Sequence, residues 1–169
     1  MAKTVFERKE DEVKRKILIA MDDSDNALRA VSFVAEAFDS ESEIVLLSVV
    51  PKITAACELN ADTLAAHFKS QQAAFCQVEE EKEKLLREAL GKGKQMLLDA
   101  GYEDGKIRME LKQQKKGIAR DIVSEAERLD ADLIVLGRRG LSGIKEFFLG
   151  SISQKVLQLC KDRSALLVQ

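Results

Sequence analysis

The sequence predicts a single α/β domain built on a doubly wound, five-stranded, mainly parallel sheet with helices on both faces. Three short apolar runs, 16–21, 43–50 and 132–137, show no alternation with polar residues, which is typical of strands buried on both faces. Segments with apolar residues at helical spacing separate these runs. Such alternation of strand and helix favours a parallel sheet. The chain of 169 residues is long enough for one core of this kind.

The first half of the chain predicts two strands and at least two helices. The strand 16–21 reads KILIAM and is followed by DDSDNA, whose residue types are frequent helix N-caps. Apolar residues at helical spacing then predict a helix that ends near Phe38. The second strand, 43–50, ends at Pro51. The long amphipathic stretch 63–100 fits either one helix or two.

The second half continues the alternation. Gly101 is a suitable C-cap for the long helical stretch, because glycine readily adopts a positive φ. In 106–113, apolar residues alternate with charged ones, which predicts a half-exposed strand near an edge of the sheet. A helix is predicted over 117–130 from apolar residues on one face. The remaining elements are strand 132–137, helix 151–161 and strand 165–168.

Composition and charge argue against several classes of protein. The formal net charge is −2, so nothing indicates a nucleic-acid or membrane-surface protein. No apolar stretch approaches the roughly 20 residues that a membrane-spanning helix needs. Residues 1–13 are mostly charged and lack the apolar core of a signal peptide. We therefore interpret 1–13 as an N-terminal extension of a domain that covers 14–169, and we expect a cytoplasmic location.

The cysteines and the histidine suggest no chemistry. The three cysteines, Cys57, Cys76 and Cys160, are far apart and form no CxxC pair, which predicts free thiols in a reducing compartment. His67 is the only histidine, and no Cys/His cluster surrounds it. A zinc site is therefore not expected.

The stretch 137–153, GRRGLSGIKEFFLGSIS, holds four of the nine glycines. It begins at the carboxyl end of the strand 132–137, and doubly wound sheets bind ligands beyond such ends where the strand order reverses. The turn 21–24 would face the same crevice if its strand is a neighbour. Glycines let a phosphate approach backbone N–H groups, and Gly150 with Ser151 opens a helix whose first N–H groups suit an anion.

Each of these features has an alternative interpretation. Ser151 and Gln154 fit a capping box that would close the helix start by itself, and the glycines could serve a tight turn. Asp22 could bind a ribose or a base, or it could cap the first helix. The segment 91–96, GKGKQM, lacks the last glycine of GxGxxG and the GK[ST] of a P-loop, so we do not interpret it as a phosphate loop. From the residues alone, a phosphate site and a structural turn are equally supported.

A longer pattern connects these residues to a known family. Gly137, Gly140, Gly150 and Ser151 have the spacing G-x2-G-x9-G-[S/T]. With this motif, and with KILIAMDDSD, IVLLSVVP and ADLIVLGRRGLSGIKEFFLGSISQKVL, the chain resembles the universal stress protein family over 14–168. The resemblance implies a Rossmann-like sheet of order 3-2-1-4-5, in which the first and fourth strands are neighbours.

The resemblance also implies an ATP site in this crevice, with Mg²⁺ or Mn²⁺ carried by the phosphates because no cage of protein carboxylates is evident. Asp22 and the backbone around Ala20 would contact the adenosine, and Val49 would pack against adenine. Leu136 and Gly137 would line the floor. The residues implied near the ribose and the phosphates are Arg139, Gly140, Leu141, Ser142, Gly143, Gly150, Ser151, Ile152 and Ser153.

Two positions depart from the family pattern. The residue after Asp22 is often glycine in the family and is Asp23 here, so an added carboxylate would either weaken phosphate binding or help hold a metal. The last strand lacks the usual proline. The resemblance implies a homodimer through this strand, whose apolar edge would otherwise be exposed. Its residues are Ala165, Leu166, Leu167 and Val168.

Three functions follow as hypotheses. The first is an ATP-binding, homodimeric stress-response regulator with at most slow ATP hydrolysis, since the motif brings no strong catalytic base. The second is a dimeric scaffold of the same fold that binds no nucleotide. The third is an adenylating enzyme of the wider adenine-nucleotide α-hydrolase-like group, but MDDSDN is not the serine- and glycine-rich loop that such enzymes carry. The complete glycine motif favours the first.

Overall fold

The computed structural model of the chain describes residues 15–52, 66–139 and 149–169, with the backbone alone for 66–72. The predicted N-terminal extension, 1–13, lies outside these ranges. Within them, no helix combines the length and the apolar character needed to cross a membrane. The strands are β1 (Lys16–Ala20), β2 (Glu43–Val50), β3 (Ile107–Gln113), β4 (Leu133–Gly137) and β5 (Ser164–Val168).

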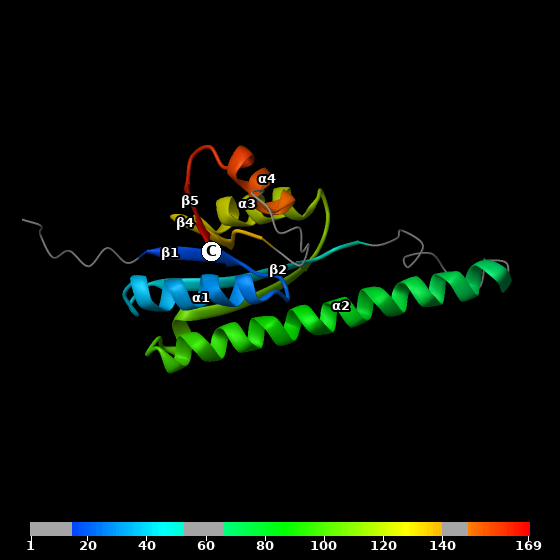
Figure 1. Cartoon of the computed structure of the whole chain (residues 1–169), viewed down its shortest axis with the longest axis horizontal. Helices are drawn as coiled ribbons and strands as arrows, with labels where there is room; N and C mark the ends of the chain where they lie inside the picture. Colours follow the sequence, from blue (N-terminus) through cyan, green and yellow to red (C-terminus); the bar gives the residue numbers. More distant parts are fainter. Residues whose placement is uncertain (1–14, 53–65, 140–148) are drawn as a thin grey trace, which may run out of the picture.

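These five strands form one parallel sheet of order β3-β2-β1-β4-β5 (Figure 1). The predicted fold and strand order are therefore confirmed. β1 lies at the centre, and Ala20 at its end is in register with Leu47 of β2 and Leu136 of β4. The strand order reverses between β1 and β4, so the carboxyl ends of these strands form the edge at which doubly wound sheets bind ligands.

Helices cover both faces of the sheet. α1 and α2 pack on one face, and α3 and α4 pack on the other (Figure 1). Successive residues of a strand point to opposite faces, so Ile17 and Ile19 pack with α1 and α2 whereas Leu18 packs with α3 and α4. This double burial explains the uninterrupted apolar run of the strand. The helices are α1 (Asp25–Ala37), α2 (Ala66–Asp99), α3 (Ile118–Leu129) and α4 (Ser151–Leu159).

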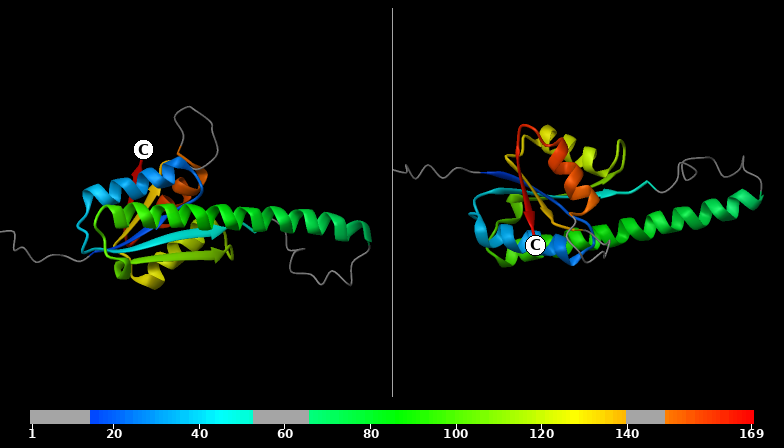
Figure 2. Two further views of the ribbon diagram at one scale, coloured as in Figure 1. Left: turned by 90° about the horizontal axis from the view of Figure 1, so that it is seen from below. Right: turned by 45° about the horizontal axis from the view of Figure 1, so that its top comes forward.

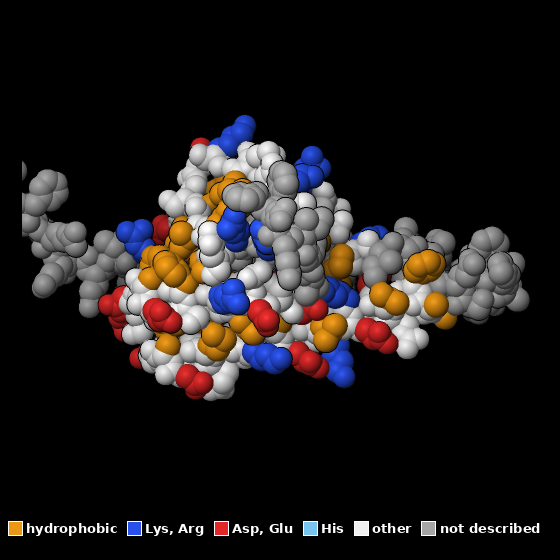
Figure 3. All heavy atoms as spheres, in the orientation of Figure 1, with side chains coloured by type: hydrophobic (Ala, Val, Ile, Leu, Met, Phe, Trp, Pro, Cys, Tyr) orange, Lys and Arg blue, Asp and Glu red, His pale blue; other side chains and the backbone are white. Residues whose placement is uncertain are grey.

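The stretch predicted as one helix or two is a single helix, α2, of 34 residues. At 1.5 Å per residue it is roughly 50 Å long. Its C-terminal half buries Leu86, Ala89, Leu90 and Leu97, and its N-terminal half extends past the carboxyl ends of the strands (Figure 2). On the face seen in Figure 3, apolar side chains and charges of both signs are interspersed along α2. Only half of this helix is therefore held by the core.

Gly101 ends α2 as predicted. Its φ is +94°, and its N–H donates to the carbonyl of Leu98 at 3.0 Å. The N–H of Tyr102 donates to the carbonyl of Leu97, also at 3.0 Å. These bonds satisfy carbonyls of the last turn, which have no partner further along the helix.

A cluster of charges joins the edge strand β3 to α3. The side chain of Glu125 is only 7% exposed, and it accepts hydrogen bonds from Arg128 Nε at 2.8 Å and from Lys112 Nζ. Glu110 lies beside the same two cations, 3.2 Å from Lys112 and 3.3 Å from Arg128. Burial raises the pKa of Glu125, but the hydrogen bonds from Arg128 and Lys112 outweigh burial and lower that pKa to about 2.

We expect the protein to lose stability as the pH falls from about 4.5 toward about 2, because the unfolded chain then binds a proton that folded Glu125 binds more weakly. The stabilisation from ionised Glu125 is fully present above the pKa that this residue has in the unfolded chain, and it is on the order of 2–3 kcal/mol. Glu125→Gln should lack it at neutral pH and should show a weaker dependence of the unfolding free energy on pH. Urea denaturation at about pH 6 and about pH 3.5 measures this.

The matched control for this prediction is Glu127→Gln, which removes an exposed carboxylate from the same helix. It should keep the pH dependence of the parent protein. If Glu125→Gln also kept it, the stabilising role assigned to the charge cluster would be wrong.

The structure corrects one expectation about the cysteines. Cys76, on α2, is disulfide-bonded rather than free, and its partner lies outside the described residues. Cys160 is free, and its thiol donates to the carbonyl of Arg163 at 3.2 Å. Spacing along the chain does not reveal a disulfide, because pairing depends on which cysteines the fold brings together.

Candidate functional site

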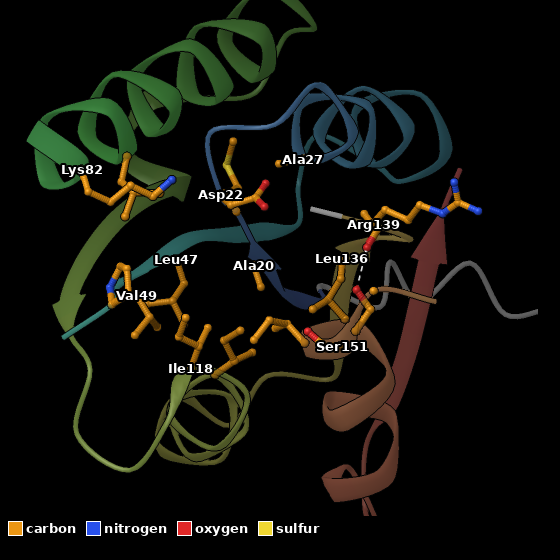
Figure 4. Close-up of a pocket in the computed structure, with 18 residues that line it drawn as sticks. Ala20, Asp22, Ala27, Leu47, Val49, Lys82, Ile118, Leu136, Arg139 and Ser151 are labelled. Carbon is orange, nitrogen blue, oxygen red and sulfur yellow. Dashed lines mark hydrogen bonds between the residues drawn. The ribbon is translucent and has the colours of Figure 1, made fainter. Parts of the chain in front are cut away.

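A cavity of about 250 Å³ opens at the carboxyl ends of the central strands. Residues from both ends of the chain meet in it, including Ala20 of β1, Val49 of β2, Leu136 of β4 and Ser151 of α4 (Figure 4). The cavity lies where the strand order reverses, which is the position that the sequence predicts for the ligand.

One half of the cavity is apolar. Leu47, Leu86 and Ile122 belong to the buried core as well as to this lining, so the wall is held by the packing of the sheet and helices. A flat ring placed here would exchange contact with water for contact with hydrocarbon. Apart from Ile152 at the start of α4, the apolar lining residues are Ala20, Met21, Ala27, Leu47, Val49, Pro51, Leu86, Ile118, Ile122 and Leu136.

The other half is formed by the end of β4 and the start of α4. Gly150 is the N-cap of α4, and it has no side chain that could accept from the first N–H groups of the helix. Ser151 and Ile152 follow in the first turn and line the cavity, and Arg139 lies at the same end (Figure 4). N–H groups at a helix start carry partial positive charge. This half therefore suits an anion.

The capping-box interpretation of Ser151 is wrong. α4 begins at Ser151 and its N-cap is Gly150, so the serine is one residue too late for that role. The N–H of Gln154 donates to the carbonyl of Gly150 at 2.9 Å, which is an ordinary first helical bond. The hydroxyl of Ser153 instead donates to the carbonyl of Gly137 at 2.9 Å and ties α4 to the end of β4.

Close packing against α1 requires glycine at position 137. The φ of Gly137 is not positive, so the tight-turn interpretation fails there. A Cβ at Gly137 would lie 2.8 Å from the backbone oxygen of Asn26 and 2.9 Å from its carbonyl carbon. The first turn of α1 therefore fills the space that a side chain at position 137 would occupy. The same contact holds the turn that precedes α1 beside the cavity.

Asp22 lines the cavity and orients the helix cap without being the cap. Its Oδ1 accepts hydrogen bonds from the backbone N–H of Ser24 at 3.1 Å and from the Ser24 hydroxyl. Ser24 is the N-cap of α1, and its Oγ accepts from the N–H of Ala27 at 3.3 Å. The cap interpretation of Asp22 is therefore wrong, and its carboxylate stays at the cavity wall.

Lys82 of α2 is a lining residue that sequence reasoning missed. Lys82 lines the cavity and forms an ion pair with Asp23. The two predictions for Asp23, weaker phosphate binding or metal binding, both took its carboxylate to be unpaired, and it is not. A signal was present in the sequence, because Lys82 shares a helical face with Leu86, Ala89 and Gly93 and that face packs on the sheet. Among the described residues, no three His, Cys, Asp or Glu side chains gather as metal ligands.

The cavity brings together ten of the fourteen predicted site residues. These are Ala20, Asp22, Val49, Leu136, Gly137, Arg139, Gly150, Ser151, Ile152 and Ser153. The other four, Gly140, Leu141, Ser142 and Gly143, lie outside the described residues. Eight lining residues were not predicted, namely Met21, Ala27, Leu47, Pro51, Lys82, Leu86, Ile118 and Ile122.

Residues 14–162 match the universal stress protein family. The chain belongs to this family. It is 30% identical over 156 residues to the universal stress protein MJ0531 of Methanocaldococcus jannaschii, which covers 89% of this chain and 80% of that protein. It is also 30% identical over 149 residues to the universal stress protein YxiE of Bacillus subtilis, covering 85% of this chain and 92% of that protein.

Solved structures share the fold of this universal stress protein. UspA from Lactobacillus plantarum has a TM-score of 0.68 at 17% identity and covers 92% of this chain and 98% of its own. A universal stress protein in complex with cAMP has a TM-score of 0.58 at 20% identity and covers 92% and 97%. One from Archaeoglobus fulgidus in complex with dAMP has a TM-score of 0.56 at 20% identity and covers 92% and 98%. At these identities the likeness concerns the fold.

Proposed function

We propose that this universal stress protein binds ATP in the cavity and acts as a homodimeric regulator in the stress response. The observation that carries the proposal is the division of one cavity into an apolar half and a half that opens on a helix start. An adenine ring suits the first half and a phosphate chain suits the second. Two proteins of the same fold in complex with cAMP and with dAMP support adenine-nucleotide recognition by this architecture.

In the proposed orientation the base packs against Val49, and the phosphates lie at the N–H groups of Ser151 and Ile152, close to Arg139. The carboxylate of Asp22, between these ends, would accept a hydrogen bond from the ribose. Mg²⁺ or Mn²⁺ would be held mainly by the phosphate oxygens, because the described part of the chain offers no cluster of carboxylates for it.

Hydrolysis in this site is proposed to be slow. Asp22 is the only carboxylate among the described lining residues, and its Oδ1 already accepts two hydrogen bonds from Ser24. A general base must reach the attacking water and be free to take its proton. We therefore expect turnover far below the roughly 10 s⁻¹ of a typical enzyme.

The proposed homodimer forms through β5. This strand is at the edge of the sheet, and the residues from Ala165 to Val168 are half-buried by one protomer alone. An edge strand offers unpaired N–H and C=O groups, which pairing with a second copy would satisfy.

A cytoplasmic location is part of the proposal, and the disulfide at Cys76 weighs against it because disulfides persist mainly in oxidising compartments.

The first experiment is to denature the purified protein and to identify and quantify any nucleotide released, by chromatography and mass spectrometry. We expect ATP near stoichiometry, or tight binding when the nucleotide-free protein is titrated with ATP and Mg²⁺. Light scattering on the purified protein before denaturation reports the dimer. Absence of binding at about 1 mM ATP would mean a binding free energy weaker than about −4 kcal/mol, and a scaffold without nucleotide would then be the better proposal.

A further inference from the structure

An ion pair between two elements lies at the apolar end of the cavity. Lys82 of α2 donates to Asp23, in the turn between β1 and α1. The two side chains are 22% and 16% exposed, so the pair is largely shielded from water. Figure 4 shows Lys82 across the cavity from Arg139 and Ser151, which mark the end assigned to the phosphates.

Packing on either side keeps the lysine within reach of its partner. Lys82 lies one helical turn before Leu86, which is buried and also lines the cavity. Further along α2, a Cβ at Gly93 would lie 2.9 Å from the Cε of Met21, so the helix packs closely on the residue that leads into the turn. The position of Lys82 is therefore set by the core of the protein and not by the ion pair alone.

The charges around the cavity explain what the pair does for a ligand. Asp22 lines the cavity and Asp23 follows it in the chain, so two carboxylates lie next to each other beside the cavity. Both would repel a phosphate chain, and repulsion acts over a longer range where water is excluded. Lys82 balances one of the two charges. The other carboxylate, Asp22, accepts hydrogen bonds from Ser24 instead.

We propose that Lys82 is a positioning residue that makes the cavity acceptable to a nucleotide with several negative charges, because it neutralises Asp23. This inference rests on the proposed nucleotide binding and names the property of the ligand, its charge, that the pair governs. The effect of Lys82 should be largest for ATP, smaller for AMP and close to zero for uncharged adenosine. A lysine that only anchored α2, or that touched the base, would affect the three ligands equally.

The test compares Lys82→Met with the parent protein by calorimetric titration with adenosine, AMP and ATP at low ionic strength. Affinity for ATP should fall roughly threefold to tenfold, and affinity for adenosine should change by less than about twofold.

The double variant Asp23→Asn/Lys82→Met carries neither charge and should bind ATP nearly as the parent does. Added salt should reduce the difference between Lys82→Met and the parent. Lys84→Met, an exposed lysine of α2 outside the cavity lining, should behave as the parent.

Asp23→Asn alone is the second variant, which keeps the test valid if Lys82→Met does not fold. It leaves Lys82 unbalanced and should tighten ATP binding by a similar factor without affecting adenosine. Equal losses for all three ligands, no loss for ATP, or no recovery in the double variant would each overturn the inference. A parent protein that binds none of the nucleotides would overturn the proposed function itself. If the parent protein and Lys82→Met both bind ATP with the same affinity, only the role of Lys82 would be overturned.

Discussion

Replacing Ser151 by glutamate is expected to lower the affinity for ATP at least about thirtyfold while the protein stays folded. Ser151 is exposed, is the first residue of α4 and lines the cavity. A carboxylate there would stand where the phosphates are proposed to lie, and like charges about 4 Å apart in a partly shielded site repel by several kcal/mol. The same carboxylate should stabilise α4 by about 0.3–1 kcal/mol through the helix dipole.

The opposite signs of these two effects separate a binding defect from a folding defect. Calorimetric titration measures the affinity, and thermal denaturation measures the stability. Gln154→Glu is the matched control, because it makes the same change of charge at an exposed position of α4 that does not line the cavity. Its affinity for ATP should stay within about threefold of the parent. If Ser151→Glu bound ATP as tightly as the parent, the proposed orientation of the nucleotide would be wrong.

Replacing Gly137 by alanine is expected to reduce the free energy of unfolding by about 1–3 kcal/mol and to weaken nucleotide binding. The added Cβ would lie 2.8 Å from the backbone oxygen of Asn26, and a backbone atom in the first turn of α1 cannot rotate away as a side chain can. The start of α1 must therefore move, and the turn that holds Asp22 must move with it. Urea denaturation measures the first effect and titration with ATP the second.

Gly91→Ala is the control for this prediction, with an effect of the opposite sign. Gly91 lies in the interior of α2, and a Cβ there would meet nothing within 4 Å. Alanine should therefore raise the free energy of unfolding by roughly 0.5–1 kcal/mol, because glycine is the poorer helix former. An alanine at position 137 that left both stability and ATP binding unchanged would show that α1 can retreat without cost.

The elements that could be predicted are those whose burial leaves a pattern in the chain. β1, β2 and β4 are buried on both faces, and each is a continuous apolar run. β3, at the edge, alternates between apolar and charged residues as its half-exposed position requires. The length of α2 could not be decided in this way, because an amphipathic period is the same in one long helix as in two shorter ones that share a face.

The candidate site was predictable in its position and less so in its detail. The motif that contains Gly137 and Ser151 does reach the cavity. The packing role of Gly137 was missed, because a contact with α1 that fills the space of a side chain leaves no local pattern. Lys82 was missed because the charged run around it is typical of a solvated helix face. Only the path of α2 across the sheet brings this one lysine to Asp23.

The sequence by itself determined the fold class, the order of the elements and the two loops that meet at the cavity, because these depend on periodicity and spacing along the chain. The tertiary structure alone decided which charges are paired, which cysteine is bonded and which glycine is required by close packing. Each of these depends on the distance between residues far apart in the sequence. That distance is set by how the helices pack on the sheet and not by any local pattern of residues.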